Sequence, residues 1–109
     1  MSNSTTAIAS CQDILPGQFK RFRYQTRFIL IINLEGQFYA LDDQCPHEDV
    51  SLAQGFLVDG KIQCPLHGSQ FCVKTGQVQL EPAETNLRTY RLETKNDMIY
   101  ITAANPVLS

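Results

Sequence analysis

Long apolar runs, an excess of charge and an export signal are all missing from this sequence. No apolar run approaches the ~20 residues that a membrane span requires, so we expect no membrane partner. Nine basic residues stand against eleven acidic ones, for a net charge of -2, which argues against nucleic acid as a partner. The first ten residues, MSNSTTAIAS, lack the basic start and apolar stretch of a signal peptide, so we expect a cytoplasmic protein.

The size of the chain predicts one domain. Its 109 residues, 43% of them hydrophobic, can form a real core but are too few for two domains. We therefore expect a single domain over residues 1–109, with loose ends at about 1–6 and 104–109. No segment shows a sustained period of 3.6 residues, so helices are not expected to build that core.

Strand-like runs separated by turn signals predict an all-β fold. Residues 18–24 read as a strand, and the nearly continuous apolar run 27–34 reads as a buried one. The pair Glu35-Gly36 marks a tight turn into a third strand, because glycine supplies the positive φ that such turns demand. Two further hairpins are predicted around turns at 75–76 and 95–97.

Two loops, at about 42–55 and 64–71, carry the most specific motif. The first contains CPH (Cys45–His47) and the second CPLH (Cys64–His67), with 16 residues between them. In a chain without an export signal, cysteines point to metal or redox chemistry before disulfides. Each proline stiffens the backbone beside its cysteine, and Gly68 permits a close approach of the backbone. The pattern predicts a metal centre.

The order of the four candidate ligands separates two kinds of metal site. Structural zinc usually joins like with like, as in Cys-x2-Cys with His-x3-His. Here each loop contributes one cysteine and one histidine, which suits a binuclear centre. The arrangement resembles the Rieske [2Fe-2S] proteins, and the resemblance covers almost the whole chain from about Ala7 to Thr102. A zinc-stapled binding module without redox function is the alternative.

The resemblance implies an antiparallel β-sandwich with a small cluster-binding subdomain made of two loops, holding one [2Fe-2S] cluster. It assigns Cys45 and Cys64 to one iron and His47 and His67 to the other. Two thiolates with two neutral imidazoles leave the oxidised cluster uncharged, so an electron enters it more readily than a cluster with four thiolates. The residues that the resemblance places beside these ligands are Pro65, Gly68 and Ser69.

Four positions near the ligands predict the branch of the family. High-potential Rieske proteins carry two extra cysteines that join the loops, where this chain has Val50 and Leu66. They also donate hydrogen bonds to the cluster sulfurs from a serine and a tyrosine, of which this chain keeps Ser69 but has Phe71 at the tyrosine position. With one donor lost, we expect a potential in the lower part of the Rieske range of roughly -150 to +300 mV.

The small size of the chain predicts a carrier and not an enzyme. It has no nucleotide fingerprint and no mononuclear-iron triad. It resembles the small, monomeric Rieske ferredoxins that carry single electrons from a flavin-containing, NAD(P)H-dependent reductase to the terminal oxygenase of a bacterial ring-hydroxylating dioxygenase. The runner-up is a Rieske-type small subunit of an assimilatory nitrite reductase.

We interpret two clusters of charged residues as parts of the solvent-exposed surface. The basic stretch Lys20–Arg27 alternates with apolar and aromatic residues, as a strand with one solvated face does. Asp42, Asp43, Glu48 and Asp49 surround the first ligand. We expect them to form a solvated loop, with a docking rim for a basic partner as the alternative.

Overall fold

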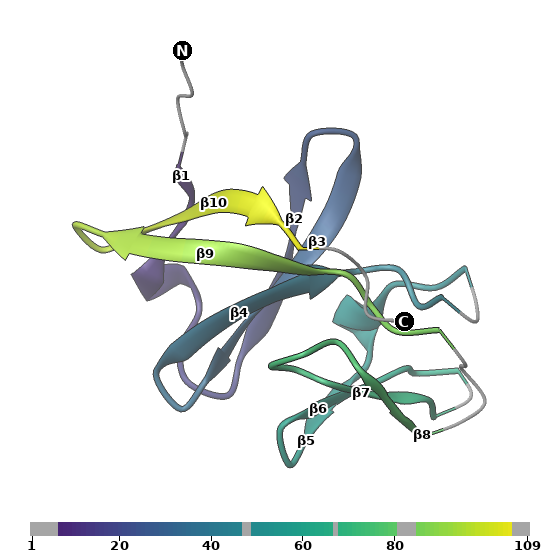
Figure 1. Cartoon of the computed structure of the whole chain (residues 1–109). Helices are drawn as coiled ribbons and strands as arrows, with labels where there is room; N and C mark the ends of the chain where they lie inside the picture. Colours follow the sequence, from purple (N-terminus) through teal and green to yellow (C-terminus); the bar gives the residue numbers. More distant parts are fainter. Residues whose placement is uncertain (1–6, 47–48, 67, 81–84, 106–109) are drawn as a thin grey trace.

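The structure is a computed structural model of the chain, and it describes residues 7–46, 49–66, 68–80 and 85–105. Within these residues ten antiparallel strands form two sheets (Figure 1), which confirms the all-β prediction. The elements are β1 (Ala7–Ser10), the 3-10 helix η1 (Cys11–Asp13), β2 (Phe19–Tyr24), β3 (Arg27–Leu34), β4 (Gln37–Asp42), the 3-10 helix η2 (Leu52–Gln54), β5 (Phe56–Val58), β6 (Lys61–Gln63), β7 (Gln70–Cys72), β8 (Val78–Leu80), β9 (Thr89–Lys95) and β10 (Met98–Ala104).

The larger sheet has six strands in the order β1-β10-β9-β4-β3-β2. Strand β9 meets β4 at two residue pairs, Ala40 with Tyr90 and Leu41 with Thr89. The sheet bends there, so that β1 and β10 pass across β2 and β3 (Figure 1). Buried side chains of β10 therefore pack against those of β3, and the folded sheet forms the sandwich that the sequence predicts.

Strand β3 is buried on both faces. Leu30 and Ile32 point to one side of the sheet and Ile29 and Ile31 to the other, and all four have no exposed surface. A strand covered on both sides reads as a continuous apolar run and not as an alternating one. The predicted burial of residues 27–34 is thereby confirmed for the centre of the strand.

The tight turns carry residues that tolerate a left-handed backbone. Between β3 and β4, Glu35 and Gly36 have φ values of 54° and 93°, and between β9 and β10, Asn96 and Asp97 have values of 52° and 66°. Two-residue hairpins whose twist matches the strands need positive φ at both positions. The side chain of Asn33 accepts a hydrogen bond of 2.8 Å from the Gly36 amide and fixes the first turn. These two predicted hairpins are confirmed, and so is the third, around residues 75–76, which joins the antiparallel strands β7 and β8.

The smaller sheet carries the second Cys-His segment. Its order is β5-β6-β7-β8, and the segment connects β6 to β7. Strands β5 and β6 form a hairpin around Asp59 and Gly60, whose φ values are 49° and 76°. This hairpin was not predicted. The expectation of a subdomain made of two loops therefore omitted the sheet on which one of the loops is built.

Two apolar cores lie on opposite faces of the larger sheet. We call the one that faces the smaller sheet the inter-sheet core and the one inside the bent larger sheet the sandwich core. Burying one large apolar side chain contributes about 1.5–3 kcal/mol, so both cores hold their layers firmly. The inter-sheet core comprises Leu30, Ile32, Leu41, Cys45, Leu52, Ile62, Cys64, Phe71, Val73 and Leu87. The sandwich core comprises Ala9, Ile14, Ile29, Ile31, Ala40, Tyr90, Ile99 and Ile101.

Two expectations concern the chain as a whole, its ends and its contact with membranes. Residues 1–6 and 106–109 lie outside the described residues, whereas Ala104 ends β10. The backbone amide and the side-chain amide of Asn105 donate hydrogen bonds of 2.9 Å to the carbonyl and the hydroxyl of Thr89. The described residues contain no helix that is long and apolar enough to cross a membrane.

Candidate metal centre

The two loops that carry Cys45 and Cys64 lie at the same end of the molecule (Figure 1). We call residues 43–55 the first loop, which runs from β4 to β5, and residues 64–69 the second loop, which runs from β6 to β7. The first loop leaves the larger sheet and the second leaves the smaller one. A metal bound by both loops would therefore join the two sheets.

Cys45 and Cys64 occupy equivalent places in the two loops. The Cys45 amide donates a hydrogen bond of 3.0 Å to the carbonyl of Val50, and the Cys64 amide donates one of 2.8 Å to the carbonyl of Ser69. Each loop is thus closed by its cysteine onto the residue five positions later. Both cysteines are 1% exposed and belong to the inter-sheet core.

The donor set of this core fits half of a Rieske centre. Two buried thiols from separate loops, packed in one apolar cluster, supply the two sulfur ligands that such a cluster takes on one of its irons. The other two predicted ligands, His47 and His67, lie outside the described residues. The described part of the chain accordingly contains no group of three side chains able to hold a metal.

The neighbours of Cys64 in the second loop allow a tight bend. Gly68 has a φ of 80°, which favours glycine, and its amide donates a hydrogen bond of 3.3 Å to the carbonyl of Cys64. Pro65 is half-buried beside Cys64, and Ser69 is fully buried. Leu66, at the outside of the bend, is 57% exposed. The loop thus presents an apolar residue to solvent two positions after a buried cysteine.

Asp43 organises the first loop, a role that the sequence analysis missed. It is 3% exposed, and its carboxylate accepts hydrogen bonds from the Ser51 hydroxyl (2.9 Å) and the Ala53 amide (3.0 Å). Its carbonyl accepts another of 2.7 Å from the amide of Leu52. The guanidinium of Arg21 lies 4.0 Å from the carboxylate. The expectation of a solvated residue was wrong for Asp43, because a buried carboxylate with several donors fixes the backbone around Cys45.

Gly55, at the end of the first loop, packs directly on the strand that leads into the second. A Cβ atom at this position would lie 2.0 Å from the carbonyl oxygen of Gln63, the residue before Cys64. Glycine alone permits this approach of the two backbones. The sequence shows a glycine at a loop end here, but the contact joins segments that only the folded structure brings together.

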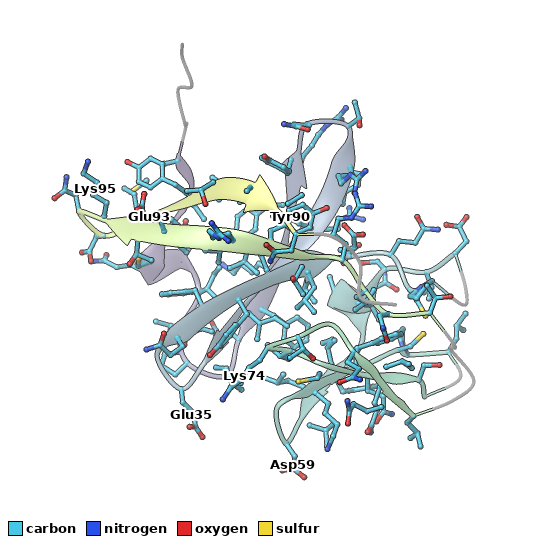
Figure 2. All side chains as sticks on the ribbon, viewed as in Figure 1. Glu35, Asp59, Lys74, Tyr90, Glu93 and Lys95 are labelled. Carbon is cyan, nitrogen blue, oxygen red and sulfur yellow. The ribbon has the colours of Figure 1, made fainter. Side chains whose placement is uncertain are left out.

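A hydrogen-bonded trio anchors the start of the first loop. The hydroxyl of Tyr90 donates a short hydrogen bond to the carboxylate of Asp42, and the guanidinium of Arg27 donates one of 3.1 Å to that hydroxyl. Arg27 also lies 3.7 Å from the Asp42 carboxylate. Tyr90 belongs to β9, and Figure 2 shows it near the middle of the molecule. Burial and the hydrogen bond to Asp42 raise the pKa of Tyr90 to about 12, so its hydroxyl stays a donor at neutral pH.

The other two cysteines lie outside the loops and differ in acidity. Cys11 begins η1 and Cys72 ends β7, and all four cysteines of the chain are thiols in the structure. Burial and the nearby charge of Asp97 raise the pKa of Cys11. Burial alone would raise the pKa of Cys72 as well, but hydrogen bonds with Thr75 and the charge of Lys74 lower it below its ordinary value.

The fold and the buried cysteine pair agree with the family to which the chain is related. The chain belongs to the family of Rieske [2Fe-2S] domains, which it matches over residues 4–91. It therefore holds one Rieske-type [2Fe-2S] cluster. A curated relative and a solved structure, both named as ferredoxins of dioxygenase systems, show to which kind of Rieske protein the chain is similar.

The chain is 38% identical to the ferredoxin component of biphenyl 2,3-dioxygenase from Rhodococcus jostii (strain RHA1), over 88% of this chain and 90% of that one. A solved complex of reduced oxygenase and oxidised ferredoxin in carbazole 1,9a-dioxygenase contains a chain that is 31% identical, with a TM-score of 0.83, covering 89% of this chain and 91% of that one. The ferredoxin of carbazole 1,9a-dioxygenase from Nocardioides aromaticivorans IC177, at 22% identity and a TM-score of 0.88, shares the fold over 93% of this chain and 99% of its own. The chain is thus an electron carrier and not an enzyme.

Proposed function

We propose that this protein is the ferredoxin component of a ring-hydroxylating dioxygenase system. It accepts single electrons from a flavin-containing, NAD(P)H-dependent reductase and delivers them to a terminal oxygenase. The observation that carries the proposal is the similarity to a dioxygenase ferredoxin over nearly the full length of both chains. This similarity favours the proposal over a nitrite reductase subunit or a zinc-stapled module.

The four motif residues are proposed as the cluster ligands, with Cys45 and Cys64 on one iron and His47 and His67 on the other. The burial of both cysteines in one core and their equivalent loop closures support this assignment. The cluster supplies a one-electron couple, and the chain supplies the protected sulfur ligands. The residues proposed to lie beside the ligands are Pro65, Gly68 and Ser69.

The exposure of the loop tips supports a transient mode of docking. Cys45 and Cys64 are buried. Pro46, the residue after Cys45, and Leu66, two residues after Cys64, are exposed. A partner that touches the tips therefore comes close to the cysteines without unfolding the loops. A carrier must release its partner after each transfer, which favours an interface below about 1,200 Å². We propose a monomeric, cytoplasmic, single-domain protein over residues 1–109.

Metal analysis and electron paramagnetic resonance (EPR) test the ligand assignment directly. We expect about two irons and two acid-labile sulfides per chain and a Rieske-type EPR signal after reduction. Cys45→Ser and His67→Ala should each abolish that signal. Cys72→Ser is the matched control, because Cys72 lies in β7 outside both loops, and it should retain the signal. Stoichiometric zinc without iron would overturn the assignment.

Reconstitution tests the role in electron transfer. Purified reductase and oxygenase components of a biphenyl dioxygenase system should turn over only when this protein is added, in an amount well below stoichiometric. The Cys45→Ser variant should not support turnover. Isolation from its host as a permanent complex with a nitrite reductase large subunit would replace the proposed function with that alternative.

A further inference from the structure

One buried carboxylate lies in the first loop, that of Asp43, two positions before Cys45. Its residue is 3% exposed, and every other acidic residue that the structure describes is half-buried or exposed. Two residues of chain span at most about 7 Å, so the Cα atoms of Asp43 and Cys45 are no farther apart than that. A charge on Asp43 is therefore a close neighbour of the thiol that the first loop offers to a metal.

Hydrogen bonds hold this carboxylate in one position. Its Oδ1 atom accepts hydrogen bonds from the Ser51 hydroxyl (2.9 Å) and the Ala53 amide (3.0 Å). Its Oδ2 atom faces the guanidinium of Arg21 at 4.0 Å. Each oxygen thus faces a donor group, and a carboxylic group that acts only as an acceptor is ionised. The first loop therefore contains a fixed negative charge.

The positive charge opposite Asp43 is more exposed to solvent than the carboxylate is. The side chain of Arg21 is 48% exposed, against 4% for that of Asp43. The Arg21 guanidinium stacks at 4.3 Å on the ring of Phe28, which is an exposed residue. Water screens an exposed charge more than a buried one. The two charges therefore do not cancel at Cys45, and the buried negative charge has the larger effect there.

The surroundings of Cys45 transmit the field of this charge. Cys45 is 1% exposed and belongs to the inter-sheet core. Leu52, whose amide donates a hydrogen bond of 2.7 Å to the carbonyl of Asp43, belongs to the same core. Charges interact more strongly in an apolar interior than in water, because the effective permittivity is lower. A negative charge on Asp43 therefore makes the addition of a further negative charge near Cys45 unfavourable.

We propose that the carboxylate of Asp43 lowers the reduction potential of this protein by repelling the electron that arrives at the cluster. The proposal rests on the function proposed above, since it assumes that Cys45 holds the cluster. In each cycle the protein takes one electron from the reductase and passes it to the oxygenase, and no bond forms or breaks. A lower potential makes the reduced protein a stronger electron donor, which favours delivery to the oxygenase.

Asp43→Asn and Asp49→Asn form a matched pair of variants for the test. Both remove one negative charge from the first loop by the same chemical change, but Asp49 is exposed. In Asp43→Asn the side-chain oxygen can still accept the hydrogen bonds from Ser51 and Ala53. A third variant, Arg21→Gln, removes the opposite charge. The holoproteins are titrated in a spectroelectrochemical cell at pH 7, and the reduced fraction is measured at the midpoint potential of the wild type.

We expect Asp43→Asn to raise the ratio of reduced to oxidised protein at this potential about tenfold, which is about 59 mV for a one-electron couple. Asp49→Asn should change the ratio less than about twofold, because solvent screens its charge. Arg21→Gln should lower the ratio about twofold, since it removes an exposed positive charge. At an ionic strength of about 1 M, most of the effect of Asp43→Asn should remain, because buried charges are screened little by salt.

Asp43→Glu separates the charge from the fit of the side chain in the loop. It keeps the charge but changes the hydrogen-bond geometry, so its midpoint should stay near that of the wild type even where its stability falls. A shift in Asp43→Glu equal to that in Asp43→Asn would overturn the proposal, because a disturbed loop would then explain both. Equal shifts in Asp43→Asn and Asp49→Asn would also overturn it and indicate an effect of net charge alone.

Wild-type midpoints in both Asp43→Asn and Arg21→Gln would refute the role of this charge and leave the electron carrier intact. Iron content and the EPR signal of each variant show whether its cluster is in place. If Asp43→Asn does not retain its cluster, Arg21→Gln decides the matter, because its midpoint must fall below that of the wild type. Failure of the proposed function would look different, since the wild type itself would then show neither the EPR signal nor a one-electron transition.

Discussion

Replacing Gly55 with alanine tests how tightly the two loops are held together. The added Cβ atom would lie 2.0 Å from the carbonyl oxygen of Gln63, 3.1 Å from the carbonyl carbon of the same residue and 3.2 Å from the carbonyl oxygen of Leu52. All three are backbone atoms, so no rotation of a side chain relieves the contact. The first loop must move away from β6, or β6 must move with Cys64.

The size of that movement follows from the contact distances. The closest contact must open from 2.0 Å to at least 3.0 Å, the shortest separation that a real Cβ atom tolerates. Metal–ligand distances in proteins hold to within about 0.2 Å, so a shift of this kind between the loops exceeds what a shared metal centre accommodates. We expect Gly55→Ala to destabilise the protein by about 3 kcal/mol, the upper part of the usual range for overpacking.

Urea unfolding and iron content measure the two consequences separately. Gly17→Ala is the control, because Gly17 has a φ of 84° but open space around its would-be Cβ, far from either loop in the sequence. It should cost about 1 kcal/mol through backbone strain alone and keep its full iron content. A Gly55→Ala protein with wild-type iron, EPR spectrum and unfolding midpoint would show that the loops tolerate a change in their separation, and the reasoning would fail.

Three further predictions concern buried polar groups and thiols. Asp43→Ala should destabilise the holoprotein by about 3 kcal/mol, since it leaves several donors of the first loop without an acceptor, and urea unfolding with Asp49→Ala as control would measure this. The raised pKa of Tyr90, about 12, makes its contribution to stability complete below about pH 10 and lost as pH rises through about 12. Tyr90→Phe should therefore cost about 1–3 kcal/mol at pH 8 and flatten the fall in stability above pH 10; an unchanged slope in urea titrations would contradict this. Iodoacetamide should label Cys72 at a lower pH than Cys11, because their pKa values are shifted in opposite directions, and mass spectrometry showing the reverse order would refute it.

The sandwich could be predicted from the sequence because its signals are local. The centre of the run 27–34, residues 29–32, is apolar throughout because both of its faces are covered, and the turns at Glu35 and Asn96 use residues that accept a left-handed backbone. The hairpin around Asp59-Gly60 gave the same kind of signal and was missed because its strands have three residues each. Runs this short show no periodicity that distinguishes them from loops.

In the candidate metal centre, too, the residues marked by local motifs could be predicted, and those whose roles depend on tertiary contacts could not. The cysteines are visible in the sequence because each stands in a short motif with a proline and a histidine. The roles of Asp43 and Gly55 cannot be seen in the sequence. The role of Asp43 depends on its burial by the folded loop, and that of Gly55 depends on its contact with Gln63. An aspartate in a run of acids reads as solvated until the donors that surround it are known.

Strand β3 contributes side chains to both cores, and this couples the unfolding of one core to that of the other. Each core alone could form a cooperative unit that unfolds by itself, as parts of a protein often do. Because Leu30 and Ile32 belong to one core and Ile29 and Ile31 to the other, neither unit can open without disturbing the same strand. The amides at the centre of β3 should thus exchange with solvent deuterium only through global unfolding, and their exchange rates give the stability of the whole chain.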